Sequence, residues 1–243
     1  MIRLFLYECR RLLWNRFFLG LGLLLLFCGW QVLNRATIFG VARTAPFSPW
    51  SFGDYLSRML PFLWIGVLLL LSAYVTPQAR RTAVLTDAAP MPPWQYAAVR
   101  CAAVSAGAGL FLSCCLGEAA LFYQLCFGWH DWETLLAPAL ITLPPPLIFA
   151  LGAGWRLSRI HPWLTYVWMA APAVWTIVPL PEPLGLLDGS LFTSLPLALA
   201  ALDPAVLDPA FSLPGSAWLS QGLMVIAGAG FLLAGSIRSL FSA

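Results

Sequence analysis

The 243-residue sequence contains no lysine, and charged residues make up only 9% of it, against roughly 25% in an average soluble domain. Its basic side chains are 13 arginines, which with ten acidic residues give a formal net charge of +3. Without lysine there is no GxxxxGK[ST] loop of the kind that binds nucleotide phosphates. We therefore expect no cofactor on this chain, no bound ATP and no nucleic-acid partner.

Motifs for enzymatic chemistry are also scarce. The two histidines, His130 and His161, are predicted to lie on opposite sides of a membrane, so they cannot share a zinc ion, and neither HExxH nor CxxC occurs. Most of the six cysteines fall in or beside predicted membrane spans, where cysteine behaves as a small apolar residue. We predict no catalytic, cofactor-binding or metal-binding residue. A membrane-embedded enzyme is accordingly the weakest alternative.

Hydrophobic residues dominate instead, at 60% of the chain. Six apolar stretches reach or approach the roughly 17–25 residues that a helix needs to cross a bilayer. Backbone groups in lipid must pair within their own segment, so these stretches should be helices. The sequence thus predicts an all-α polytopic membrane protein with a single transmembrane domain over residues 17–243. Its six spans are expected at residues 17–33, 56–75, 101–127, 135–154, 162–180 and 217–237.

Arginine sets the predicted orientation. With a cytoplasmic N-terminus, ten of the 13 arginines lie on the cytoplasmic side, and only Arg35, Arg43 and Arg58 lie outside. Short cytoplasmic segments carry an excess of basic residues in membrane proteins. We therefore predict a multi-pass protein of the cell membrane with both termini in the cytoplasm.

Residues 1–16 have the pattern of an amphipathic helix. Ile2, Phe5, Leu6 and Cys9 recur at helical spacing, whereas the arginines occupy other faces. A basic helix of this kind lies along the lipid headgroups before the chain enters the membrane. The alternative is an ordinary charged flank that anchors the first span.

The external segment, residues 181–216, is largely apolar but contains six prolines. Its pieces are too short to cross the membrane and too apolar for a solvated loop. We predict short helices that enter the outer leaflet or pack over the spans as a lid. A seventh span over residues 184–202 is the alternative; it would bury Asp188 and place Arg238 outside.

The stretch "TPQARRTAVLTDAAPMPPWQYAAVR", residues 76–100, forms the first cytoplasmic loop. A helix can start at Thr86 or Asp87, and the prolines that follow limit it to about two turns. Residues 86–95 are more apolar and richer in proline than a connecting turn requires. They favour a short cytoplasmic helix that another protein contacts, and a basic loop without a partner is the alternative.

This layout resembles the permease subunit of ABC exporters with six-helix, ABC-2-type transmembrane domains. "MIRLFLYECRRLLWNRFF" is similar to the family's elbow helix, with Arg-Arg and Asn-Arg ahead of the first span. "VLTDAAPMPPWQYAAVR" is similar to the family's stretch where the chain returns to the membrane, with Arg100 in place of the common lysine. The external segment corresponds to the family's two re-entrant helices between spans five and six.

The resemblance implies a homodimer or heterodimer of permeases around a translocation path, in contact with membrane lipid. It also implies two separate cytoplasmic ABC ATPase subunits, which would bind ATP and Mg²⁺, and a bacterial plasma membrane. Residues 86–95 would be the coupling segment, which docks on the ATPase. The residues expected to contribute are Asp87 as the helix cap, Ala88, Ala89, Met91 and Trp94 as apolar contacts, and Arg80 and Arg81 beside them.

Two features inside the spans complete the predictions. Glu118 is the one carboxylate in a predicted span, near its outer end. It either takes part in substrate passage or bonds to the external segment or Arg58. Pro144, Pro145 and Pro146 should kink or break a fourth helix that faces protein.

A secondary transporter or a non-transporting assembly subunit is the alternative function, although carriers generally need more intramembrane carboxylates and repeated halves.

Overall fold

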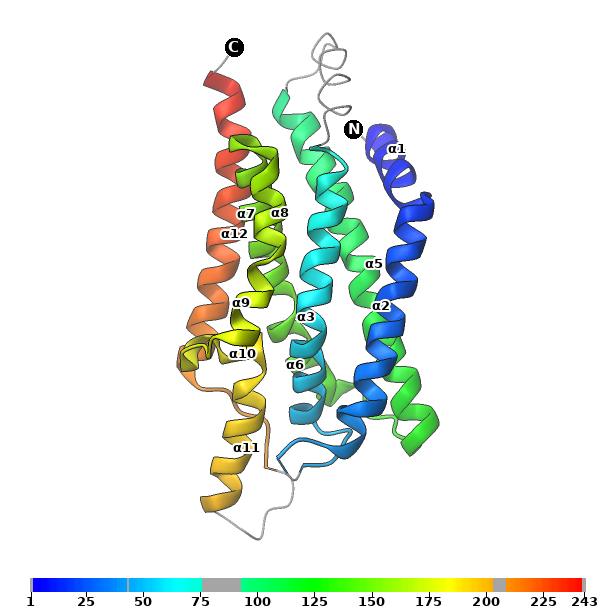
Figure 1. Ribbon diagram of the computed structural model, residues 1–243, viewed down its shortest axis with the longest axis vertical. Helices are drawn as coiled ribbons and strands as arrows, with labels where there is room; N and C mark the ends of the chain where they lie inside the picture. The colour runs from blue at the N-terminus through cyan, green and yellow to red at the C-terminus, as the bar shows by residue number, and fades with distance from the viewer. Residues whose placement is uncertain (1, 43, 76–92, 203–208, 242–243) are drawn as a thin grey trace.

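The computed structural model describes residues 2–42, 44–75, 93–202 and 209–241, which form helices without any strand. Figure 1 shows a bundle in which the long helices run roughly parallel to one axis. The helices are α1 (Ile2–Leu13), α2 (Arg16–Arg35), η1 (Thr37–Phe39), α3 (Pro49–Ser72), α5 (Pro93–Phe127), α6 (Glu133–Thr142), α7 (Pro144–Ile160), α8 (Pro162–Met169), α9 (Ala171–Ile177), η2 (Glu182–Leu184), α10 (Gly185–Asp188), α11 (Ser190–Leu202) and α12 (Gly215–Phe241).

Five helical segments in the described residues are long and apolar enough to cross a membrane: Arg16–Phe39, Pro49–Ser72, Gln95–Phe127, Glu133–Ile160 and Gly215–Leu233. They correspond to the predicted first, second, third, fourth and sixth spans. The all-helical, multi-pass prediction is therefore confirmed at this level.

The predicted fifth span, residues 162–180, is not among these five. It is divided into α8, which ends at Met169, and α9, which begins at Ala171 and has Pro172 in its first turn. Proline lacks the N–H that would continue the backbone ladder. The described residues therefore contain five helical segments that are long enough to cross a membrane, with a chain of short helices between the fourth and the last of them.

The central helix is α3, which contacts α2, α5, α6, α7 and α8. In its apolar stretch, 67% of the residues are buried, against 22% in that of α2. Ser48 caps its N-terminus and Pro49 occupies the first turn, a favourable start for a helix. Because α3 begins seven residues earlier than predicted, Asp54 and Arg58 belong to the helix, where they form an ion pair of 2.7 Å.

The fourth span breaks where three prolines follow one another. Helix α6 ends at Thr142 and α7 begins at Pro144, with Leu143 between them. Pro145 and Pro146 are buried. The prediction of an interrupted fourth helix that faces protein is thus confirmed.

Close contact between α7 and α12 depends on glycine. A Cβ atom on Gly152 would overlap the carbonyl oxygen of Gly228, and one on Gly228 would lie 2.7 Å from the carbonyl oxygen of Ile148. By contrast, a Cβ on Gly230 or Gly109 would meet open space. Small residues allow backbones to approach in membranes, and here one glycine from each helix does so.

The external segment folds back against α3. Helices α10 and α11 meet at a bend of 116° when α10 is taken together with η2. The Ser57 hydroxyl donates to the Leu186 carbonyl at 2.7 Å, and the Trp50 indole donates to the Pro209 carbonyl at 2.8 Å. Gly53 leaves room for the ring of Phe192. These contacts agree with short helices packed on the spans, as either a broken span or a re-entrant loop.

Both ends of the described chain lie at one end of the bundle. Figure 1 shows α1, the start of α5 and the C-terminal end of α12 there, and α11 at the opposite end. The predicted cytoplasmic segments therefore share one end, and the predicted external segment is at or toward the other.

Candidate functional site

The predicted coupling segment cannot be compared with the structure directly. Arg80, Arg81, Asp87, Ala88, Ala89 and Met91 lie outside the described residues, and the backbone of Trp94 falls in the first turn of α5. The structure does describe the two positions where this loop leaves and re-enters the bundle. Tyr74 follows α3 directly, and Tyr96 lies in the first turn of α5.

These two tyrosines bond to the same buried acid. Glu8 of α1 is 0% exposed. The Tyr74 hydroxyl donates to its Oε2 at 3.2 Å, and the Tyr96 hydroxyl donates to its Oε1 at 3.1 Å. One carboxylate therefore joins α1 to both flanks of residues 76–92.

Two arginines complete the group, which we call the Glu8 cluster (Glu8, Arg11, Tyr74, Tyr96 and Arg100). Arg11 lies one turn after Glu8, with its Nη1 atom 3.6 Å from Oε2. The Arg100 guanidinium lies over the Tyr96 ring at 4.2 Å and over the Tyr74 ring at 5.5 Å. Cation–π contacts of this kind add attraction beyond packing. Arg11 thus lies beside the buried carboxylate, and Arg100 lies over the rings of its two tyrosine donors.

The surroundings of Tyr74 raise the pKa of its phenol. Burial raises the pKa of Tyr74, and the charge of the Glu8 carboxylate and its hydrogen bond raise that pKa further. Both arginines act in the opposite direction. The phenol therefore keeps its proton at neutral pH and serves as a donor to Glu8.

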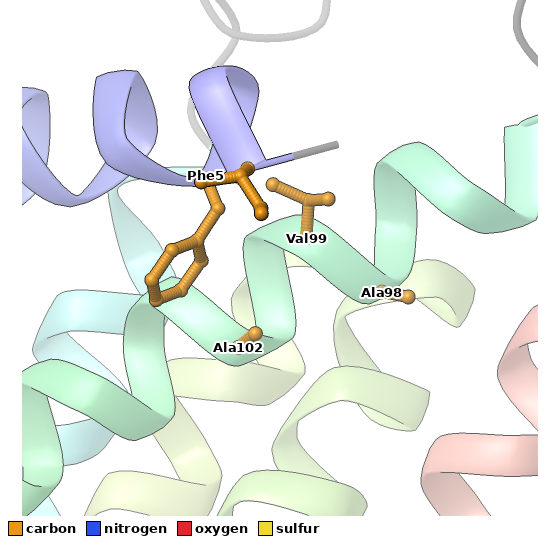
Figure 2. A pocket seen from close by; sticks show the side chains of 5 residues that line it. Phe5, Ala98, Val99 and Ala102 are labelled. Atoms are coloured by element: carbon orange, nitrogen blue, oxygen red, sulfur yellow. The ribbon is translucent and has the colours of Figure 1, made fainter.

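Apolar contacts hold α1 on α5 around this cluster. Figure 2 shows Phe5 lying across α5 beside Ala102, with Val99 directed toward α1. Further along, Gly107 lies beneath Leu12 and Leu13. The face of α1 that is turned inward therefore carries Glu8 and Leu12, while Ile2 and Leu6 are exposed. The amphipathic helix was predicted, but the buried acid at its centre was not.

Glu118 lies elsewhere on α5. It is 22 residues beyond Tyr96, which corresponds to about 33 Å along the helix. Its side chain lies over Gly29 of α2, close to the Tyr55 hydroxyl, and its Oε2 atom is buried without a hydrogen-bond partner among the described residues. Arg58 pairs with Asp54. The expected partnership of Glu118 with Arg58 is therefore replaced by a position between α2, α3 and α5.

Sequence reasoning missed Glu8 as a site residue. One signal was present, because Glu8 is the single acid in a segment of 16 residues that carries four arginines. The second span was predicted to begin at residue 56, which leaves Asp54 outside it, although Ser48 and Pro49 mark a helix start before Asp54. Neither signal says which partner the carboxylate meets, since Tyr74 and Tyr96 are 66 and 88 positions away.

The Glu8 cluster connects α1, the end of α3 and the start of α5. Among the residues that the structure describes, no group of three or more His, Cys, Asp or Glu side chains could hold a metal ion. No protein-family model, curated protein or solved structure matches the chain. The functional argument therefore rests on the sequence pattern and on this geometry.

Proposed function

We propose that this chain is the permease subunit of an ATP-driven ABC exporter, which forms a translocation path as a dimer and is driven by separate ATPase subunits. The observation that carries the proposal is the Glu8 cluster. It fastens an N-terminal amphipathic helix to both flanks of a single loop, the loop that contains the coupling segment. A partner that moves this loop would move α1, α3 and α5 together.

Burial makes this connection effective. The Glu8 carboxylate has one tyrosine donor just after α3 and the other in the first turn of α5, so a displacement of either loop flank must move Glu8 or break a charged hydrogen bond. Hydrogen bonds to charged groups are worth about 1.5–3 kcal/mol when the geometry is good. Because α3 is central, its motion would reach α2, α7 and the external segment through the contacts of the bundle. Rigid-body coupling of this kind is a common mode of conformational switching.

The opposite end of the bundle supports the same proposal. The external segment packs short helices on α3 through Ser57 and Trp50. Movement of α3 at the loop end would therefore also move the external segment, where cargo leaves. In this account the loop end faces the cytoplasm of a bacterial plasma membrane, ATP and Mg²⁺ bind the partner ATPases, and a second permease completes the path.

The test concerns the coupling segment. Its sequence suggests that Met91 and Trp94 are apolar anchors, and truncation of such anchors typically costs about 2 kcal/mol or more in binding. Met91→Ala/Trp94→Ala should therefore release the ATPase while membrane insertion and thermal stability stay unchanged. A matched control is Met224→Ala/Trp218→Ala on α12, which removes the same side chains far along the chain and should retain the ATPase. Full retention of the ATPase by the coupling-segment variant, with cargo-dependent hydrolysis, would remove this segment from the mechanism.

A further inference from the structure

The break between α6 and α7 leaves polar backbone groups without their usual partners. In a continuous helix the carbonyls of Leu140, Ile141 and Thr142 would accept from the N–H groups of residues 144–146. All three of those residues are proline and have no N–H. The Thr142 hydroxyl is also buried, and its oxygen has no hydrogen-bond partner among the described residues. Three carbonyl oxygens without their usual helical donors and the Thr142 hydroxyl therefore lie within three consecutive residues at the end of α6.

On α12, the buried side chain of Gln221 also lacks hydrogen-bond partners among the described residues. Gln221 is only 3% exposed, and neither the oxygen nor the nitrogen of its amide has a hydrogen-bond partner in the described part of the chain. Its neighbour Ser220 differs, because its hydroxyl donates to the carbonyls of Pro183 and Ala217. A buried amide left unpaired costs free energy, so Gln221 requires a partner.

The helix register places Gln221 beside the break. Helices α7 and α12 run in the same direction through the bundle (Figure 1) and touch where Gly228 meets Ile148. Gln221 is seven residues before Gly228, which keeps it on the same face and about 10 Å lower. The same step back from Ile148 reaches Ile141. Ile141 and Ala217, one turn before Gln221, belong to one buried cluster, which agrees with this alignment.

We propose that this place is an internal water-binding site, formed by the backbone carbonyls of residues 140–142, the Thr142 hydroxyl and the Gln221 amide. The chemistry of the group selects the ligand. Carbonyls only accept, the amide nitrogen only donates, and the hydroxyl does both. Water satisfies all three kinds of group, whereas a cation would leave the amide N–H₂ unpaired and facing a positive charge. Buried water typically makes two to four such bonds.

Bound water explains how the break is tolerated within a membrane. Freed carbonyls at that depth need a donor from protein or water, and no proline can supply one. Water also allows the angle between α6 and α7 to change while each carbonyl keeps a donor, because the hydrogen bonds of water reorient as the helices move. The site involves residues of α6 and α12 beside the start of α7, so it is independent of whether the chain has an ATPase partner.

X-ray radiolytic footprinting in oxygen-18 water tests the site in the purified full-length protein. Bound water yields hydroxyl radicals in place, so Leu143 and Pro145 should be oxidised although they are buried. The fully buried Leu63 and Leu68 on α3 serve as controls and should stay unmodified. Oxidation of Leu143 and Pro145 no greater than that of these controls would overturn the proposal.

The sign of a stability change gives a second, separate test. In a dry site, Gln221→Leu removes an unpaired amide and should raise the melting temperature. In a hydrated site it takes away partners of the water and should lower it, and Pro145→Ala should recover part of the loss by giving the Ile141 carbonyl an N–H. A higher melting temperature for Gln221→Leu would refute the water site. If that variant fails to fold, the wild-type footprint still decides.

Discussion

Replacement of Glu8 by alanine should weaken the attachment of α1 to the bundle, and the contacts of Glu8 determine the loss of free energy. The two tyrosine donors lie at 3.1 and 3.2 Å, which is long for an O–H···O bond. We therefore assign about 1 kcal/mol to each bond, below the usual value of roughly 1.5–3 kcal/mol for a charged acceptor. The pair with Arg11 adds about 0 kcal/mol, because Arg11 is 46% exposed and its nitrogen is 3.6 Å away.

Loss of the acceptor also affects the tyrosines. The Tyr74 hydroxyl is buried and would be left unpaired, at about 1 kcal/mol, whereas the half-buried Tyr96 can turn to water. Relief of carboxylate burial offsets part of this sum. We expect Glu8→Ala to lower the free energy of unfolding by about 2 kcal/mol, and Glu8→Gln, which keeps one acceptor, by about 1 kcal/mol.

The assay is equilibrium unfolding of the purified protein in mixed micelles with increasing SDS. Glu133→Ala is the matched control, since it removes an exposed acid and should change little. A double-mutant cycle between Glu8→Ala and Tyr74→Phe should give a coupling of about 1 kcal/mol. Equal stability of Glu8→Ala and Glu133→Ala, or a coupling near zero, would refute the reasoning for the whole Glu8 cluster.

Three further outcomes follow from described contacts. Gly152→Ala should destabilise the bundle by about 1–3 kcal/mol, because the new methyl meets the Gly228 backbone, whereas Gly230→Ala should be neutral in the same unfolding assay. Because burial and Glu8 raise the pKa of Tyr74, the folded state holds that proton more tightly than the unfolded chain, in which tyrosine titrates near pH ~10. The resulting stabilisation is present below about pH 10 and declines above it, and Tyr74→Phe should remove that alkaline decline in a pH series of melting temperatures. Glu118→Gln should reduce cargo export if the carboxylate takes part in passage, and unchanged export and assembly in vesicles would exclude that role.

Long apolar runs were predictable because their signal is local. The first span was expected at residues 17–33 and occupies Arg16–Arg35; Asn15 caps it and Arg35 closes it. The proline break in the fourth span was equally readable, since three missing N–H groups interrupt any helix. In both cases the deciding chemistry lies within a few residues of the feature.

The start of α3, the division of the fifth span and the role of Glu8 were missed. The start of α3 was placed too late, at residue 56, although Ser48 and Pro49 mark a helix start before Asp54; its packing against α10 and α11 depends on distant parts of the chain. The fifth span was read as continuous because its composition is apolar, yet Pro172 divides it. The role of Glu8 depends on two tyrosines from distant parts of the chain, and no local pattern encodes that meeting.

The central claim is that a separate ATPase drives this chain, and co-purification tests it most directly. The tagged full-length protein is isolated from its native membrane in mild detergent, every retained chain is identified by mass spectrometry, and ATP hydrolysis of the eluate is measured with and without Mg²⁺. The account predicts a retained ATPase subunit without membrane spans, in a ratio of about one per permease, and Mg²⁺-dependent hydrolysis that this chain alone does not show. An eluate that contains no ATPase, from membranes in which the chain is folded and active in transport, would contradict it.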